Sequence, residues 1–167
     1  GQDGAPLSVV FAPRKQAVIS AEVATTVLSI HKEFGQGFDE GELLIEMDAT
    51  RFEHQRQRAG SMAAAASNAY NVNKQLYDSD SASLMDVEEA RKDLGVASAE
   101  VRLAKDDIEA CTITAPYSGR VDKVLVHEHE LVQEGQPLME IVDDSVLRVK
   151  TLLPSSMFKD VDVDMAV

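Results

Sequence analysis

Two stretches of this 167-residue chain match each other at a constant offset of 94 residues, without a gap. The first runs from about Ser20 to Glu46 and the second from about Thr114 to Glu140. The identical pairs are Ala21/Ala115, Val27/Val121, Glu40/Glu134, Gly41/Gly135, Leu44/Leu138 and Glu46/Glu140. An internal repeat that preserves apolar and glycine positions indicates two similar structural units. We therefore expect two half-domains that pack on one another, separated in the sequence by an inserted arm.

Each half is rich in short runs that are typical of β-strands. They occupy residues 17–20, 26–30 and 43–47 in the first half and residues 120–126 and 137–142 in the second. Gly41 and Gly135 lie at equivalent points between these runs, where a tight turn can require positive φ. Because each half alone would expose an apolar face, the two must pair to bury it. The sequence predicts one β-sandwich built from residues 17–48 and 112–143.

Between the halves, the apolar period changes from two residues to seven. In the first part of the arm, the positions that step by 3 and 4 are Phe52, Gln55, Ala59, Met62, Ala66, Ala69, Asn73 and Leu76. In the second part they are Val87, Ala90, Leu94, Ala97, Val101, Ala104, Ile108 and Cys111. Two such seams of equal length predict an antiparallel helical hairpin, with Leu94 and Val101 buried between the helices. At 1.5 Å per residue, helices of roughly 27 residues would make an arm about 40 Å long.

The ends of the helices are indicated separately. Residues 50–53 (Thr-Arg-Phe-Glu) fit a capping box, and residues 83–86 (Ser-Leu-Met-Asp) are a similar start for the second helix. A polar turn at residues 78–82 lies between the two helices. The arm should therefore have a defined tip near residues 77–84.

Composition excludes several classes of protein. The formal net charge of −13 argues against nucleic-acid binding, since phosphates require a basic face. The single cysteine, Cys111, excludes an internal disulfide. No apolar run approaches the ~20 residues of a membrane span, so we expect a soluble fragment of a longer protein.

Several local strings resemble those of periplasmic adaptor subunits, or membrane fusion proteins, of Gram-negative tripartite efflux pumps. Residues 113–121 (Ile-Thr-Ala-Pro-Tyr-Ser-Gly-Arg-Val) resemble the family's I-x-A-P-x-S-G-x-V motif. Val132, Gly135 and Leu138 resemble the turn and strand that follow it, and residues 145–156 resemble the entry into the family's β-barrel domain. The resemblance covers nearly the whole chain from about residue 17.

The resemblance implies an α+β fold, in which a lipoyl-like β-domain (a barrel-sandwich hybrid) is interrupted by an antiparallel α-helical coiled-coil hairpin. It places the β-domain at residues 17–48 and 112–143, the hairpin at 49–111, and part of a β-barrel domain at 1–16 and 144–167. The implied function is non-enzymatic and needs no cofactor. The protein would be periplasmic, anchored to the inner membrane at full length, and would bind an inner-membrane transporter and a TolC-like outer-membrane channel. The resemblance favours a transporter of the resistance–nodulation–division (RND) type and a ring of three or six copies.

The same resemblance points to partner-binding residues at the tip. Adaptors that dock on TolC-like channels carry an arginine, then a leucine four residues on, then a serine seven residues beyond that. Leu76 and Ser83 match the leucine and the serine, whereas Val72 stands at the arginine position and Lys74 lies close by. The implied docking residues are therefore Leu76, Ser83 and Lys74. Ser83 also fits an N-cap that needs no partner, and Val72 leaves the TolC-like identity of the channel open.

Other functions leave weaker patterns. A lipoyl or biotinyl carrier needs a lysine at the turn between the halves, but residues 47–50 are Met-Asp-Ala-Thr. The four histidines accompany no serine or cysteine motif, so we expect no hydrolase. A metal-ion efflux adaptor is the more serious alternative, because His127 and His129 would share one side of an extended chain, beside Glu130. A polar loop between strands is the simpler interpretation of these residues.

Overall fold

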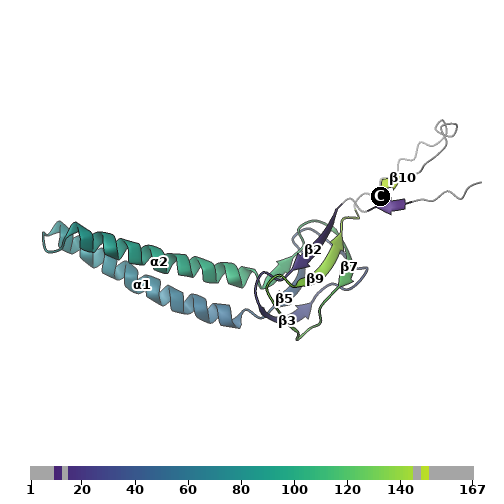
Figure 1. Ribbon diagram of the computed structural model, residues 1–167, viewed down its shortest axis with the longest axis horizontal. Coiled ribbons are helices and arrows are strands. Elements are labelled where there is room, and N and C mark those ends of the chain that lie inside the picture. The colour runs from purple at the N-terminus through teal and green to yellow at the C-terminus, as the bar shows by residue number, and fades with distance from the viewer. Residues whose placement is uncertain (1–9, 13–14, 145–147, 151–167) are drawn as a thin grey trace, which may run out of the picture.

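The computed structural model describes residues 10–12, 15–144 and 148–150. Its elements are β1 (Val10–Ala12), β2 (Gln16–Ser20), β3 (Thr25–Ile30), β4 (Gly37–Phe38), β5 (Leu43–Met47), α1 (Thr50–Asp78), α2 (Leu84–Glu109), β6 (Thr112–Thr114), β7 (Gly119–Val124), β8 (Leu131–Val132), β9 (Pro137–Val142) and β10 (Arg148–Lys150). The strands gather at one end, and the two helices form a long arm that projects from them (Figure 1). The predicted α+β fold, a β-domain interrupted by a helical hairpin, is confirmed.

Two open, four-stranded antiparallel sheets form the β-domain, in the orders β2-β9-β7-β4 and β6-β5-β3-β8. Each sheet contains strands from both halves of the repeat, because β2 pairs with β9 and β6 pairs with β5. The remaining strands, β1 and β10, pair with each other in a two-stranded sheet. Most of residues 1–16 and 144–167, where the sequence predicts part of a β-barrel, lie outside the described residues.

The sequence repeat reappears as a pseudo-twofold relation in the backbone. The bounds of β3 and β4, shifted by 94 residues, give those of β7 and β8. Hydrogen bonds between the halves repeat in the same way: the Ala21 N–H donates to the Gln136 carbonyl at 2.9 Å, and the Ala115 N–H donates to the Glu42 carbonyl at 2.9 Å. The two halves are therefore interlocked, and neither has a complete sheet without the other.

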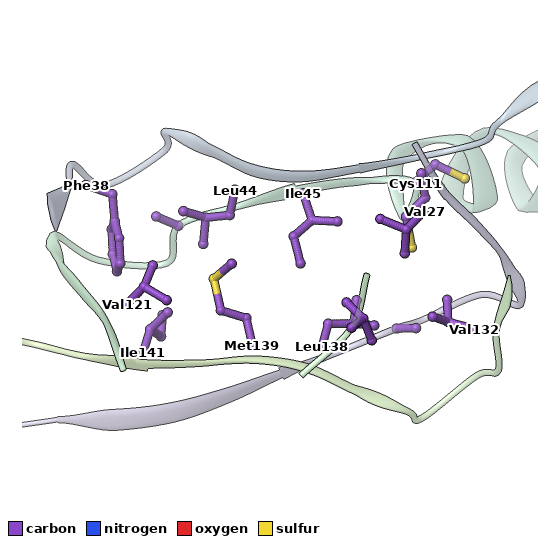
Figure 2. Close-up of a cluster of buried hydrophobic side chains, with 14 of the residues drawn as sticks. Val27, Phe38, Leu44, Ile45, Cys111, Val121, Val132, Leu138, Met139 and Ile141 are labelled. Atoms are coloured by element: carbon purple, nitrogen blue, oxygen red, sulfur yellow. The ribbon is translucent and has the colours of Figure 1, made fainter. Parts of the chain in front are cut away.

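The core of the β-domain is built from residue pairs that the repeat relates. Each of the pairs Val27/Val121, Phe38/Val132, Leu44/Leu138, Ile45/Met139 and Met47/Ile141 is at most 5% exposed. Figure 2 labels all of these residues except Met47 and shows the labelled side chains in the space between the two layers of strands. Burial of a large aliphatic side chain contributes about 1.5–3 kcal/mol, so this shared core is the main source of the domain's stability.

The turns of the repeat match as well, with one exception in residue type. Gly41 and Gly135 adopt φ of +82° and +81°, as predicted for these turns. A second pair of positions also lies in the left-handed region, but here Gly35 (φ +80°) corresponds to His129 (φ +69°). A non-glycine residue seldom adopts this conformation, so the loop before β8 is held by the fold rather than by local preference.

The predicted seam of α2 is confirmed, and that of α1 is corrected. The eight seam positions of the second helical segment are buried or partly buried. Leu94 and Val101, however, are only partly buried, because the arm is just two helices thick. In α1 the less exposed positions include Phe52, Ala59, Ala63, Ala66, Tyr70 and Asn73. The predicted seam residues Gln55, Met62, Ala69 and Leu76 are exposed, and Met62 and Leu76 are 47% and 41% exposed.

The observed α1 seam keeps four predicted positions that are seven residues apart: Phe52, Ala59, Ala66 and Asn73. Between Ala59 and Ala66, the less exposed residue is Ala63 rather than the predicted Met62. The facing helix contributes the buried alanines Ala90, Ala97 and Ala104, which allow the two helices to approach closely. A small side chain fits such a contact better than the long methionine, which lies to one side.

The cap of α1 also differs from the prediction. Thr50 is the first helical residue rather than the cap, and the N-cap Ala49 has no side-chain hydrogen bond. Asp48 supplies the acceptor instead, since its carboxylate takes the Thr50 N–H at 2.9 Å. The hydrogen bonds to Thr50 lower the pKa of Asp48.

Gly119 provides a test of how closely two neighbouring strands of one sheet, β7 and β9, approach each other. A Cβ at this position would overlap the carbonyl group of Val142 in β9. Gly119→Ala should therefore force the backbone apart and cost about 1–3 kcal/mol, as overpacking does. Gly95→Ala is the matched control, because no atom lies within 4 Å of its added Cβ and alanine favours a helix by about 0.5–1 kcal/mol. Thermal melts in which both variants behaved alike would contradict this packing.

Candidate docking site at the hairpin tip

The tip of the hairpin is a short, well-capped turn. Helix α1 ends at Asp78 and α2 begins at Leu84. The Ser81 N–H donates to the Leu76 carbonyl at 2.7 Å, which closes the end of α1. Asp80 adopts φ of +58°, a conformation that aspartate tolerates better than most residues. The backbone hydrogen bonds of the turn make the tip a defined surface rather than a frayed end.

Large apolar side chains are exposed around this turn. Val72 and Leu76 in α1 are 54% and 41% exposed, and Leu84 and Met85 at the start of α2 are 57% and 78% exposed. Tyr77 is 42% exposed beside them. Sequence reasoning selected Leu76 but missed Tyr77, Leu84 and Met85. The available signal was a group of apolar residues outside the seam and next to a polar turn.

Ser83 forms the capping box predicted from the sequence. Its hydroxyl accepts the Asp86 N–H at 3.2 Å and donates to the Asp86 carboxylate at 2.7 Å. The same carboxylate accepts the Ser83 N–H at 2.8 Å. These hydrogen bonds from the Ser83 hydroxyl and then its backbone hold the pKa of Asp86 below its usual range. Ser83 therefore shapes the tip, and its hydroxyl is already engaged within the chain.

Lys74 is exposed, but it does not share a face with Leu76. Two residues apart in a helix, the side chains point about 200° away from each other. Within the part of the chain that the structure describes, Lys74 forms no salt bridge. The three residues selected from the sequence therefore lie in the tip region, with Leu76 and Lys74 on different sides of α1.

The histidine pair lies far from the tip in the sequence, in the loop before β8. Residues 128 and 129 form a turn, so the extended geometry that would align His127 with His129 is absent. His127 approaches the Glu130 carboxylate through its Nδ1 atom at 3.6 Å, and that carboxylate also accepts the His127 N–H at 2.9 Å. Among residues 15–144, no three histidine, cysteine or acidic side chains converge in a geometry suited to a metal ion.

The structure is thus a β-sandwich of two interlocked halves, interrupted by a helical hairpin with an exposed tip. Residues 15–144 match the family model described as "RND MFP, barrel-sandwich hybrid domain". The match covers more than half of the chain. The chain therefore belongs to the membrane fusion proteins of RND transporters, the periplasmic adaptor family of efflux pumps.

Individual relatives are distant. The chain is 25% identical over 164 residues to the nickel-cobalt-cadmium resistance protein NccB of Alcaligenes xylosoxydans xylosoxydans, an alignment that covers 91% of this chain and 41% of NccB. The chain spans less than half the length of the curated relatives that it matches.

Solved structures share the fold at lower identity. A putative efflux transporter from Bacteroides eggerthii superposes with a TM-score of 0.80 at 19% identity, covering 91% of this chain and 47% of that one. A MacA–MexA chimera that carries the Pseudomonas aeruginosa MexA α-hairpin gives a TM-score of 0.76 at 22% identity, covering 93% and 57%. Within the described ranges, neither helix is both long and apolar enough to cross a bilayer.

Ser83→Ala tests whether this serine acts as a cap. The substitution removes the hydroxyl that donates to the Asp86 carboxylate, so the pKa of Asp86 should rise towards its ordinary value. Because the folded-state pKa of Asp86 is lowered, its contribution to tip stability is present at neutral pH and is lost as the pH falls through that pKa. Carboxyl NMR titration measures the shift. Ser79→Ala, whose hydroxyl bonds to the Gln75 carbonyl, is the control and should leave Asp86 unchanged. An unshifted Asp86 in Ser83→Ala would contradict the capping role.

Proposed function

We propose that this chain is the central part of a periplasmic adaptor that connects an inner-membrane transporter to an outer-membrane channel. In this role the hairpin tip docks on the channel, and the β-domain holds the hairpin in place. Family membership supports the adaptor role, and the exposed apolar tip on a capped, rigid arm supports the docking mechanism. We further propose that the full-length protein is anchored to the inner membrane and works as a ring of three or six copies.

The base of the hairpin is suited to holding the arm at a fixed angle. Phe52 of α1 and Cys111 after α2 are 4% and 1% exposed, and both belong to the core of the β-domain. Strands β5 and β6, which lead into and out of the arm, pair directly through Glu46 and Thr112. Both ends of the hairpin are therefore tied to one sheet, so the position of the tip follows the orientation of the β-domain.

The tip offers chemistry that suits an apolar groove between helices. Val72 and Leu76 are one helical turn apart on the same face of α1, and Met85 adds an exposed side chain from α2. Valine in place of the expected arginine replaces a charged contact with an apolar one. We infer a channel end that presents apolar side chains between its helices. Each tip contact is small, so a ring of copies would bind by avidity.

The similarity to NccB favours a second proposal about the cargo of the pump. NccB is named for resistance to nickel, cobalt and cadmium, and the alignment covers nearly all of this chain. The pump served by this adaptor would then export divalent metal ions, with the RND-type transporter selecting the ion. The turn at residues 128 and 129 does not align His127 with His129, so this proposal rests on the similarity to NccB and not on a preformed metal site.

Leu76→Asp tests the docking mechanism. A charge at this exposed apolar position should prevent burial against a partner, because an unpaired carboxylate is costly to desolvate. In a strain that depends on the full-length protein for efflux, resistance should be lost while protein abundance is unchanged. Met85→Asp should act in the same direction. Gln57→Asp is the control, since it adds the same charge to an exposed position near the base of α1. Normal export by both tip variants would exclude docking through this surface.

The metal proposal has its own test. Deletion of the gene should sensitise cells to nickel, cobalt or cadmium, as measured by growth at graded metal concentrations. Histidine NMR resonances followed during zinc titration would show whether His127 and His129 bind. Saturable shifts at both residues, lost in His129→Ala, would assign a site in this loop. Unchanged metal tolerance in the deletion strain would reject metal ions as the cargo.

A further inference from the structure

One short segment at the base of the arm has the opposite charge to the rest of the chain. Residues 51–58, in the first turns of α1, contain three arginines and a histidine but a single acidic residue, Glu53, whereas the chain as a whole has a formal net charge of −13. A local excess of one sign of charge attracts ligands of the other sign. The base of the arm is therefore a part of this acidic protein that is suited to an anion.

Three of these basic side chains lie on one side of α1. Arg51, His54 and Arg58 are spaced by three and then four residues, so they follow one another along the same face of the helix. All three line a shallow hollow of about 510 Å³ at the foot of the arm, where α1 leaves the β-domain (Figure 1). The charges of the two arginines therefore meet at one place on the surface.

The basic side chains of the hollow are free of ion pairs. Within the part of the chain that the structure describes, none of Arg51, His54 and Arg58 forms a salt bridge. Arg51 is nevertheless held in place, because its Nη2 atom donates to the Ala24 carbonyl at 3.1 Å and its guanidinium carbon lies 4.6 Å from the centre of the Phe52 ring. A guanidinium group has several N–H donors, so a ligand can bond to those that the Ala24 carbonyl does not use.

One acidic side chain, Asp48, also lines the hollow. Its carboxylate accepts the Thr50 N–H at 2.9 Å, and the hydrogen bonds to Thr50 hold the pKa of Asp48 below its usual range. The carboxylate of Asp48 is thus already engaged within the chain, and the charges of Arg51 and Arg58 outnumber it. The hollow keeps a net positive charge and favours an anionic group over a cationic one.

A second hollow continues from the first along the arm. Gln55 and Arg58 line both of them, so the two are contiguous. The second hollow is a groove of about 290 Å³ between α1 and α2, with four apolar side chains in its lining: Ala59, Met62, Leu103 and Ala104. Met62 and Leu103 are 47% and 63% exposed. Large apolar side chains from both helices are therefore open to a ligand in this groove.

The two hollows together make a surface with a charged end and an apolar end. Met62 follows Arg51 by eleven residues, which corresponds to about 16 Å along a helix. Glu100 and Asp107 border the groove on the α2 side, so a second anionic group placed there would be repelled. The surface therefore matches a ligand of about this length that has one anionic end and an uncharged apolar body.

We propose that this surface binds a single-chain amphiphile with an anionic head, such as a fatty acid. The carboxylate lies between Arg51, His54 and Arg58, where charge-assisted hydrogen bonds hold it. The chain lies along the groove over Met62 and Leu103 and removes their apolar surface from water. The ligand stays below the hairpin tip, so this inference depends neither on docking to a channel nor on the cargo of the pump.

Decanoate tests the proposal when it is titrated into this chain without detergent, below the concentration at which decanoate forms micelles. The imidazole resonances of His54 and the methyl resonance of Met62 should shift together and follow one saturation curve. Butyrate, which has the same head and a shorter chain, should bind at least about ten-fold more weakly, because it buries fewer methylene groups. Decyltrimethylammonium has a similar chain and a cationic head, so it should give no saturable shift at His54. Binding of this cation as tight as that of decanoate would overturn the proposal.

Two variants test the charged end and the apolar end of the surface separately. Arg58→Gln and Leu103→Ser should each weaken decanoate binding at least several-fold. Both side chains are exposed, so the melting temperature should stay close to that of the unchanged chain. Arg91→Gln and Val18→Ser are the matched controls, because they remove an exposed arginine of α2 and an exposed valine of β2 that line neither hollow. Decanoate binding that was unchanged in both Arg58→Gln and Leu103→Ser would contradict this site.

Two further outcomes would assign the binding elsewhere. Loss of decanoate binding in Met85→Ser, with Arg58→Gln unaffected, would place the amphiphile at the apolar tip and overturn the proposal. Sedimentation with phosphatidylglycerol vesicles distinguishes a free amphiphile from a lipid surface. If the chain sediments with vesicles, loses this property in Arg58→Gln and does not bind decanoate, the basic side chains serve a membrane surface and the proposal is rejected.

Discussion

The exchange of strands between the two halves is the constraint on which the rest of the structure depends. Strand β2 completes the sheet that contains β7 and β9, and β6 completes the sheet that contains β3 and β5. Because of this exchange, the apolar faces of both halves are buried in one core, and the backbone groups at their edges pair across the domain. The β-domain can therefore form only when residues on either side of the long arm come together. The arm is inserted at a point where the chain must return to an adjacent strand, which fixes both of its ends.

The residues that stabilise the β-domain and the residues proposed to contact partners lie in different parts of the sequence. The repeated positions form the core, as the pairs Leu44/Leu138 and Val27/Val121 show. The residues proposed to contact partners lie in the insertion, outside the repeat. A thin two-helix arm cannot bury its seam completely, so it depends on capping at the tip and on Phe52 and Cys111 at the base. Surface residues of the arm are then free to differ between its faces without loss of the fold.

The two sides of α2 that lie outside the helix–helix seam carry different side chains. Three acidic residues on one side and two basic residues on the other follow the same seven-residue period as the seam itself: Asp93, Glu100 and Asp107, and Arg91 and Lys105. Glu88 and Glu109 also lie near the basic side, so charge alone does not distinguish the two sides. The exposed Val96 and Leu103 lie on one side only.

Periodic and local features were readable from the sequence alone: the strands of each half, the seam of α2, the glycine turns and the Ser83 cap each depend on residues close together in the chain. The register of α1 could not be predicted from the sequence, because Met62 and Ala63 both fit a seven-residue period. The choice between them depends on how closely α2 packs through Ala97 and the neighbouring alanines. The exchange of strands and the exposed group at the tip were likewise decided by tertiary structure. Periodicity tells which side chains share a face, but which face is covered depends on the distance and angle at which another element packs.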